Sequence, residues 1–287
     1  MRRFEYFEPT SLDEAVALLA RYDGAASLLA GGTDLLVEIK EQLRRPDYVV
    51  NIKKIPGIDG FSFDERNGLR IGALITARTI ETSPWVLENY PGIAQAVREL
   101  GSIQIRNRAT LAGNLCRASP SADTLPPLMA DRARVTLYGP RGSRTVELET
   151  FFTGPGKTVM RPDELMTEIT LPPPPPRTGK AYIKHGRRKA MELATVGVAV
   201  SVTLQENRFK EVDIVLGAVA PTPIRAFKAE ATLRGQKLSE DLIEKAANAA
   251  MGESRPISNV RASADYRREM VAVLTRRALR QARDLIK

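Results

Sequence analysis

The sequence predicts an α+β protein made of two unlike parts, and three observations lead to this prediction. The first part alternates short apolar runs with amphipathic stretches of helical spacing. Five consecutive prolines follow at 172–176 and form a stiff segment. The second part has three strand-like runs before three helical stretches, an order typical of small α+β domains. We therefore expect one domain at 1–176 and another at 177–287.

Composition limits the chemistry that the chain can perform alone. It has 287 residues, enough for two domains, and one cysteine, Cys116. One cysteine excludes an intramolecular disulfide framework and a cysteine-ligated iron–sulfur or zinc cluster within this chain. The single histidine, His185, makes a Ser-His-Asp triad or a multi-histidine metal site hard to build. An enzyme of this composition would depend on a bound cofactor.

The net charge is +9, from 43 Lys and Arg against 34 Asp and Glu. Nucleic acid binding is one meaning of this charge. The basic residues are spread out and not interleaved with aromatic residues, so a solvated face, or a surface for an acidic partner or cofactor, is at least an equal alternative. No apolar run approaches the roughly 20 residues that span a bilayer, and the N-terminus has no apolar signal region. We expect a cytoplasmic protein without a membrane span.

The first part begins with a helix and a strand–turn–helix unit. Ser11 and Glu14 form a capping box, which predicts a helix over 12–22. The apolar run 27–30 predicts a strand, the turn Gly31-Gly32-Thr33-Asp34 follows, and 35–43 is amphipathic. Amide groups at such a turn can bind an anion, although a plain tight turn would have the same sequence. The pattern is neither GxGxxG nor a P-loop.

The remaining elements follow from periodicity and turn signals. In the first part we expect strands at 47–51, 69–72, 135–138, 144–148 and 164–171, and helices at 76–81, from Pro84 and at 91–100. In the second part we expect strands at 181–185, 194–204 and 211–219, and helices at 228–233, 239–251 and 263–286. Trp85, the only tryptophan, is expected in the core.

The stretch Ala109–Pro127 is unusual because it holds few long side chains. It contains Gly113, Asn114, Ser119 and Asp123 among other small or hydroxyl-bearing residues. Such residues shape irregular loops and let a ligand approach the backbone. A connecting loop before a helix is the alternative interpretation.

Three motifs together resemble a known family. They are AGGTD at 30–34, QIRNRATLAGN at 104–114 and SPSAD at 119–123. In this order and separation they resemble the FAD-binding medium subunit of molybdenum hydroxylases, the xanthine dehydrogenase and carbon monoxide dehydrogenase family. Matching segments also occur at 151–158, 163–165 and 184–194, so the similarity covers nearly the whole chain.

The resemblance implies a fold of the vanillyl-alcohol-oxidase (PCMH) type for 1–176, with subdomains at about 1–55 and 56–176. It implies a carbon monoxide dehydrogenase flavoprotein C-terminal-like domain for 177–287, with a three-stranded antiparallel sheet and helices. It further implies an oxidoreductase subunit that binds FAD noncovalently between the two subdomains. It assigns no catalytic residue and no metal ligand to this chain.

By the same resemblance, specific residues would hold FAD. Residues 30–34 would bind the pyrophosphate through amides, and 110–114 would cover its other side. Ser119 and Asp123 would bond the sugar region, Val159 or Met160 would pack near the flavin, and Lys184 would approach its pyrimidine end. The complete implied set is Leu29, Ala30, Gly31, Gly32, Thr33, Asp34, Ile103, Ala109, Thr110, Ala112, Gly113, Asn114, Ala118, Ser119, Asp123, Val159, Met160 and Lys184.

Two residues depart from the pattern of the family, and one invites over-interpretation. Glu192 stands where the family usually has Asp, and Ala112 stands where many relatives have Gly. The first departure questions a carboxylate contact, and the second could shift the loop around Gly113. Cys116 could suggest a covalent flavin, but we expect a small packed residue.

The resemblance also implies partners. A large subunit would hold the molybdenum cofactor, and a small subunit would hold [2Fe-2S] clusters that pass electrons to this FAD, in a dimer of heterotrimers. An external acceptor would then reoxidise the flavin. A self-contained FAD oxidase of the same fold is an alternative. Such an enzyme needs its own catalytic base, and the single histidine, His185, is a poor candidate for that role. A basic nucleic acid-binding protein is a second alternative.

Overall fold

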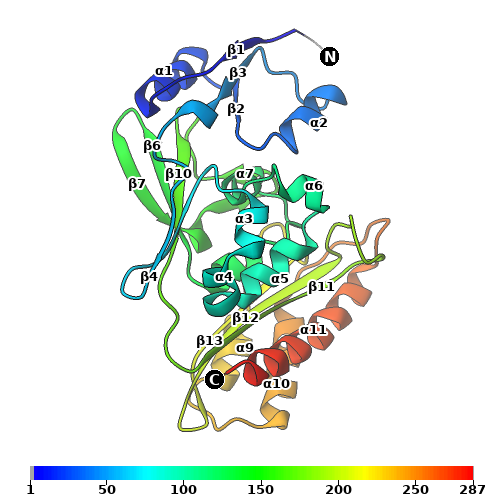
Figure 1. Cartoon of the computed structure of the whole chain (residues 1–287). Helices are drawn as coiled ribbons and strands as arrows, with labels where there is room; N and C mark the ends of the chain where they lie inside the picture. Colours follow the sequence, from blue (N-terminus) through cyan, green and yellow to red (C-terminus); the bar gives the residue numbers. More distant parts are fainter. Residues whose placement is uncertain (1–2, 287) are drawn as a thin grey trace.

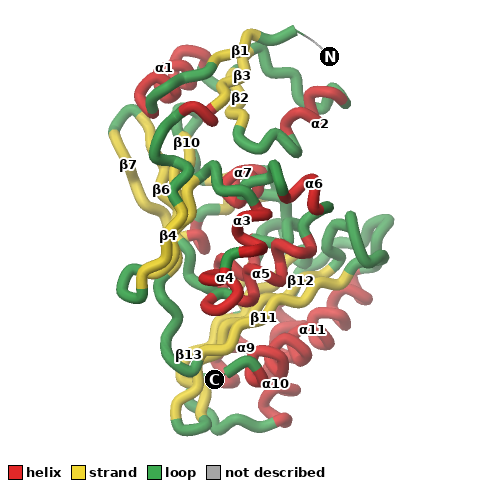
Figure 2. The backbone as a smooth tube through the Cα atoms, in the orientation of Figure 1, coloured by secondary structure: helices red, strands yellow, loops and turns green. Residues whose placement is uncertain are grey.

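In the computed structural model, residues 3–286 form three parts stacked one above the other. The N-terminal part lies at one end, a mixed part with most of the short helices lies in the middle, and the C-terminal part lies at the other end (Figure 1). Figure 2 shows that each part has its own sheet, with helices packed against it. The described residues form four sheets in all, the fourth being a two-stranded hairpin in the middle part.

The N-terminal part is a parallel three-stranded sheet of order β1-β3-β2 between two helices. Its elements are β1 (Glu5–Phe7), α1 (Leu12–Tyr22), β2 (Ala26–Leu29), α2 (Leu35–Lys40), β3 (Tyr48–Asn51) and the 3₁₀ turn η1 (Ile52–Lys54). The predicted capping box is confirmed, since Ser11 Oγ accepts from the Glu14 amide at 3.1 Å and Glu14 reaches back to the Thr10 amide at 2.8 Å. Helix α1 has the predicted bounds.

The middle part is an antiparallel five-stranded sheet of order β4-β5-β10-β6-β7, covered by short helices. Its strands are β4 (Phe61–Asp64), β5 (Gly68–Gly72), β6 (Arg134–Gly139), β7 (Gly142–Glu147) and β10 (Leu165–Leu171), with the separate hairpin β8 (Phe152–Gly154) and β9 (Lys157–Thr158). Its helices are α3 (Ala77–Thr82), α4 (Pro84–Asn89), α5 (Pro91–Glu99), α6 (Ile103–Arg106), α7 (Leu111–Arg117), α8 (Leu125–Ala130) and the 3₁₀ turn η2 (Leu148–Thr150).

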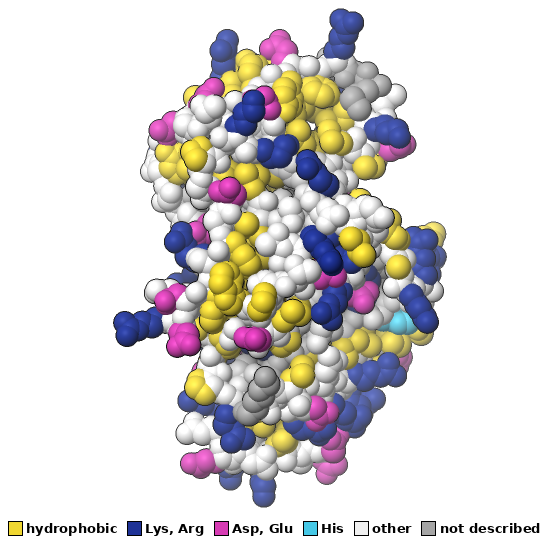
Figure 3. Space-filling view, viewed as in Figure 1, with side chains coloured by type: hydrophobic (Ala, Val, Ile, Leu, Met, Phe, Trp, Pro, Cys, Tyr) yellow, Lys and Arg dark blue, Asp and Glu magenta, His cyan; other side chains and the backbone are white. Residues whose placement is uncertain are grey.

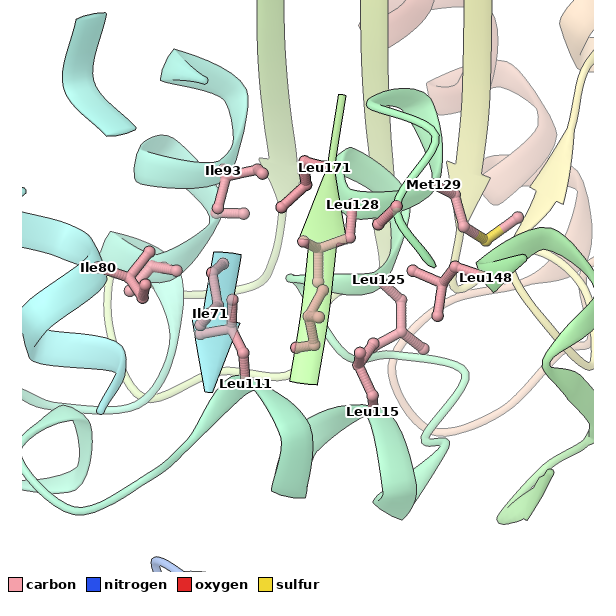
Figure 4. Packing of buried hydrophobic residues seen from close by; sticks show 14 of the residues in the cluster. Ile71, Ile80, Ile93, Leu111, Leu115, Leu125, Leu128, Met129, Leu148 and Leu171 are labelled. Carbon is pink, nitrogen blue, oxygen red and sulfur yellow. The ribbon is translucent and has the colours of Figure 1, made fainter. Parts of the chain in front are cut away.

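The core of the middle part lies between this sheet and its helices. Ile71 of β5 and Leu171 of β10 meet side chains from α3, α5, α7 and α8 (Figure 4). The same cluster of buried residues includes Tyr182, Ala199 and Val215 of the C-terminal part. The middle and C-terminal parts therefore share a hydrophobic core.

The C-terminal part is an antiparallel sheet of order β11-β12-β13-β14. Its elements are β11 (Thr178–His185), β12 (Val196–Gln205), β13 (Arg208–Gly217), β14 (Ile224–Arg225), α9 (Phe227–Leu233), α10 (Glu240–Glu253) and α11 (Ala264–Asp284). Helices α9, α10 and α11 cover one face, and α5 and α8 of the middle part cover the other (Figure 1). The predicted three-stranded sheet is corrected to four strands, because β14 has only two residues and leaves no periodic signal.

Four further expectations from sequence are corrected. The stretch Ala109–Pro127 contains all of α7 and the start of α8, so it is not an irregular loop. Trp85 is 40% exposed and is not a core residue. The helix expected over 35–43 ends at Lys40, and strands β1 and β4 lie in segments where no strand was expected.

A buried ion pair fastens the C-terminal sheet to the middle part. Lys180 Nζ of β11 lies 2.7 Å from Asp131 Oδ1, directly after α8, and both side chains are almost wholly buried. The ammonium also lies over the ring of Tyr90, 4.3 Å from its centroid. Burial raises the pKa of Asp131, and the charge of Lys180 opposes that change.

We expect Lys180→Met to lower the free energy of unfolding by about 3 kcal/mol or more, because it leaves Asp131 buried without a countercharge. The double variant with Asp131→Leu should recover much of this loss. Urea unfolding measures both effects. The control is Arg268→Met, which breaks the exposed pair with Asp265 at 2.7 Å and should cost less than about 1 kcal/mol. Equal losses for Lys180→Met and Arg268→Met would contradict the prediction.

Candidate functional site

The turn after β2 packs backbone to backbone against the connection between α6 and α7. A Cβ added to Gly31 would overlap the carbonyl oxygen of Arg108 and lie 3.0 Å from the Cα of Ala109. Only glycine permits this approach. Gly32, next in the turn, has φ +77°, which is also strained for any other residue. The motifs at 30–34 and 104–114, which are far apart in the sequence, therefore contact each other.

The amides of this turn are free to bind a ligand. Within residues 3–286, the N–H groups of Gly31, Gly32, Thr33 and Asp34 donate to no other residue. The turn is partly exposed rather than buried, so a ligand can approach it from solvent. A run of unpaired amides suits an anion such as a pyrophosphate, which accepts several hydrogen bonds at once. The residues present therefore fit an anionic cofactor.

Helix α7 begins at the other side of this contact. Thr110 caps it, and its Oγ1 accepts from the Gly113 amide at 3.0 Å. Gly113 is thus corrected from a loop glycine to an exposed residue in the first turn of a helix. Ala112 is buried in the core, so its methyl group packs away from the exposed side of this segment, where Gly113 lies. Asn114 points its Oδ1 at Thr124 Oγ1, 2.6 Å away.

An ion pair joins α7 to α2. Arg117 Nη2 lies 2.7 Å from Glu38 Oε1. Burial raises the pKa of Asp34, at the start of α2, and the nearby Arg117 opposes this rise. The N-terminal part is therefore attached to the middle part by a charge contact as well as by the Gly31 backbone contact.

A second group of predicted residues meets near the C-terminal sheet. Asp123 is 5% exposed and accepts from Tyr182 Oη at 2.8 Å and from Lys184 Nζ at 2.9 Å. Burial raises the pKa of Asp123 from its ordinary value of 3.8 to about 6, although Lys184 and Tyr182 oppose the rise. Ser119 begins the same segment and is partly exposed.

The ammonium group of Lys184 is paired and is not a free cation. Besides Asp123, its Nζ donates to the carbonyl oxygens of Glu192 at 2.6 Å and Glu99 at 3.3 Å. Its charge is therefore balanced by Asp123, and the pair presents little net charge to a neighbouring ligand. The Glu192 carboxylate lies toward Arg187 and Arg188, at 3.7 and 3.5 Å, so the contact with Lys184 comes from the Glu192 backbone.

The residues expected near the flavin lie on the α7 side. Val159 and Met160 follow β9 and are partly buried. Met160 Sδ is 3.6 Å from Cys116 Sγ. Cys116 is exposed as a residue, but its sulfur packs against Met160, and burial raises the pKa of the thiol to about 12. Ala118 is buried with φ +49° at the end of α7, and its carbonyl accepts from Gly156 at 2.9 Å.

The other predicted residues occupy two settings. Leu29 and Ala109 are buried beside the turn contact, whereas Ile103 is 52% exposed on α6. Sequence reasoning missed three residues that the structure brings to these groups, namely Lys53, Arg108 and Tyr182. Lys53 and Arg108 lie beside the turn, and Tyr182 holds Asp123. Their positions follow from tertiary contacts, and no local motif marks them.

The described residues form neither a metal site nor a membrane-spanning helix. Within residues 3–286, no cluster of three or more His, Cys, Asp or Glu side chains could hold a metal ion. None of the helices in that range is long and apolar enough to span a membrane.

The fold, and the contact of the Gly31-Gly32 turn with the connection between α6 and α7, fit an FAD-binding domain followed by a flavoprotein C-terminal domain. Residues 2–174 match the family described as the FAD binding domain in molybdopterin dehydrogenase. Residues 181–282 match the CO dehydrogenase flavoprotein C-terminal domain. The chain belongs to this family of FAD-binding subunits of molybdopterin dehydrogenases, and the expected class of fold is confirmed apart from the extra strand.

Similar proteins span the whole chain. The carbon monoxide dehydrogenase medium chain of Hydrogenophaga pseudoflava is 35% identical, over 98% of this chain and 97% of the relative. The xanthine dehydrogenase FAD-binding subunit of Escherichia coli O157:H7 is 32% identical, over 96% and 95%. A chain in the solved structure of carbon monoxide dehydrogenase from Hydrogenophaga pseudoflava superposes with a TM-score of 0.96 at 35% identity, covering 100% of this chain and 99% of that chain.

A solved chain of quinoline 2-oxidoreductase from Pseudomonas putida 86 is similar as well. Its TM-score is 0.91 at 26% identity, covering 99% of this chain and 98% of that chain. The chain is accordingly an FAD-binding medium subunit of the molybdenum hydroxylase type and an oxidoreductase subunit. The expected family is confirmed.

We expect Asp123 to impose a pH dependence on stability. Its carboxyl holds a proton in the folded state up to about pH 6, whereas the unfolded chain releases it near 3.8. Its contribution to the free energy of unfolding is therefore fully present below pH 3.8 and is lost as the pH rises through 6. Urea unfolding of the wild type and Asp123→Asn from pH 4 to 7 measures this. The free energy of unfolding of the wild type minus that of Asp123→Asn should decrease from pH 4 to pH 7. A difference that stays constant or rises would contradict the raised pKa.

Proposed function

We propose that this chain is the FAD-carrying electron-transfer subunit of a molybdenum hydroxylase complex. Electrons would reach it from [2Fe-2S] clusters of a small partner, after a substrate is oxidised at a molybdenum cofactor in a large partner. They would leave to an external acceptor. The observation that carries the proposal is the backbone contact of Gly31 with Arg108. This contact holds a partly exposed turn with four unpaired amides against the segment that precedes α7.

The residues of this chain would bind and orient FAD. The amides of 31–34 would hold the pyrophosphate, with 110–114 on its other side. Ser119 and Asp123 would bond the sugar region, and Tyr182 and Lys184 keep Asp123 in place. Val159, Met160 and Ile103 would pack against or beside the flavin ring. FAD, when bound, would supply the redox chemistry, because a flavin can accept electrons one at a time from one-electron carriers and pass them on singly or in pairs.

The proposal includes the domain division at 1–176 and 177–287, with subdomains at about 1–55 and 56–176. Separate sheets on each side of residue 176 support the division. The relatives named as medium chains and FAD-binding subunits support large and small partner subunits. We further propose a dimer of heterotrimers in the cytoplasm, where the free thiol of Cys116 would stay reduced.

Nucleic acid binding gains no support from the structure. The arginines of α11 are largely paired within the chain. Arg280 and Arg283 contact Glu240 at 2.8 and 2.6 Å, and Arg276 contacts Glu244. The basic charge of this helix is therefore balanced locally and does not form a free stripe for phosphates.

FAD binding tests the proposal directly. The full chain, alone or with its partners, should take up FAD and show the two visible absorbance bands of a flavin. Gly32→Val should weaken uptake at least about tenfold, because a β-branched residue strains the φ of +77° and displaces the amides. The matched control is Gly24→Val, since Gly24 has φ +80° in open space away from the turn.

Two outcomes would contradict the proposal. One is a wild-type chain that takes up no FAD with its partners present. The other is equal loss of FAD in Gly24→Val and Gly32→Val, which would place the effect in general folding. Cys116→Ala should retain FAD that is released by acid precipitation, because the flavin is held noncovalently.

A further inference from the structure

We propose that Lys53 and Arg108 form a cationic pair that binds the pyrophosphate of FAD from opposite sides of the Ala30–Asp34 turn. This inference rests on the proposed function and adds two side chains to a site otherwise made of amides. The two residues come from different parts of the protein. Lys53 belongs to η1 of the N-terminal part, and Arg108 precedes α7 in the middle part.

Lys53 is held against the turn. Its Nζ donates to the carbonyl oxygen of Ala30 at 3.2 Å. An ammonium group has three donors, so two stay available for a ligand. The adjacent Lys54 behaves differently, because its Nζ contacts Glu8 Oε2 at 2.6 Å. Of these two neighbouring lysines, only Lys53 faces the turn.

Arg108 is held at the same turn by its backbone. Its carbonyl oxygen is the group that excludes a side chain from Gly31. The nearby arginines have acidic partners, since Arg106 contacts Glu81 at 2.8 Å and Arg117 contacts Glu38 at 2.7 Å. Within residues 3–286, no carboxylate pairs with Arg108 or with Lys53. Both side chains are exposed and can reach a ligand.

The two charges repel each other in the absence of an anion. Partial burial lowers the pKa of Lys53, and the charge of Arg108 lowers it further. Glu8 opposes this change, but its carboxylate is already bonded to Lys54 and Asn51. Like charges near a low-dielectric surface are unfavourable unless an anion compensates them. Unpaired amides and two unpaired cations at one turn indicate that the anion is part of the site.

The chemistry of the pair matches a pyrophosphate. Two negative charges balance two cations, whereas a single carboxylate would leave one uncompensated. Arginine gives planar, directional donors to phosphate oxygens, and lysine gives a compact point charge. The surface is indented between the N-terminal part and the helices below it, and Lys and Arg side chains lie on both sides of this indentation (Figure 3).

The experiment compares ligands with and without phosphates on the full-length chain after removal of FAD. Lys53→Gln and Arg108→Gln should each raise the FAD Kd about tenfold, as loss of one charge-assisted bond predicts. The riboflavin Kd should change less than about twofold, because riboflavin has no phosphate. Isothermal titration calorimetry measures both. Lys54→Gln is the matched control and should leave the FAD Kd unchanged.

A second measurement uses inorganic pyrophosphate alone. It should raise the melting temperature of the FAD-free wild type and have a smaller effect on Lys53→Gln. Lys53→Arg, which keeps the charge, should restore most of the FAD affinity. These comparisons also separate a binding defect from misfolding, since a misfolded variant would lose riboflavin and FAD equally.

Several results would overturn the inference. If the wild type binds FAD and the FAD Kd is unchanged in both Lys53→Gln and Arg108→Gln, the inference is wrong. The proposed function would still stand in that case. Equal loss of FAD and riboflavin would also overturn it. Failure of the wild-type chain to bind FAD at all would instead contradict the proposed function itself.

Discussion

Gly31 lies directly against the carbonyl oxygen of Arg108, and the arrangement of the cofactor site depends on this backbone contact. It joins a parallel sheet of three short strands to the antiparallel sheet and helices of the middle part. A three-stranded sheet with two helices has a small core of its own. The two parts are also joined by the Arg117–Glu38 pair and by a core that includes Leu165 of β10, but the Gly31 contact is the one that lies at the turn. The absence of a side chain at one position thus sets the shape of the site.

The group of residues around Asp123 depends on a different constraint. Asp123 is buried where an ionised carboxylate is costly, and Tyr182 and Lys184 of β11 supply the bonds that keep it in place. The C-terminal sheet is in turn fixed to the middle part by the Lys180–Asp131 pair and by the shared core. The C-terminal domain therefore helps to position Asp123 through the side chains of β11.

Local signals in the sequence predicted the elements that local interactions determine. The capping box at Ser11 and Glu14 predicted α1 with its correct bounds, because the cap bonds involve neighbouring residues. Helix α7 was missed because Gly113 and Asn114 disfavour helix, and tertiary burial of Leu111 and Leu115 compensates. Strand β14 was missed because two residues have no period.

The site residues divide in the same way. The turn glycines and the small-residue stretch were identified from sequence, and their proximity was expected only through the resemblance to a family. Neither Lys53 nor Tyr182 carries a local mark. Lys53 and Lys54 are identical in type and adjacent, and they differ only because η1 directs one toward Ala30 and the other toward Glu8. No one-dimensional pattern distinguishes two such side chains.

The position of the two unpaired cations has a consequence for the assembly of the chain. Lys53 and Arg108 are brought together only when the N-terminal and middle parts are packed, so their repulsion opposes the Gly31 contact in the absence of an anion. An anion bound between the two side chains would replace this repulsion by attraction. Ligand binding and the packing of the two parts then stabilise each other, since a ligand that binds only the packed state shifts the equilibrium toward it. The cofactor is in this sense a structural component of the interface as well as the redox group.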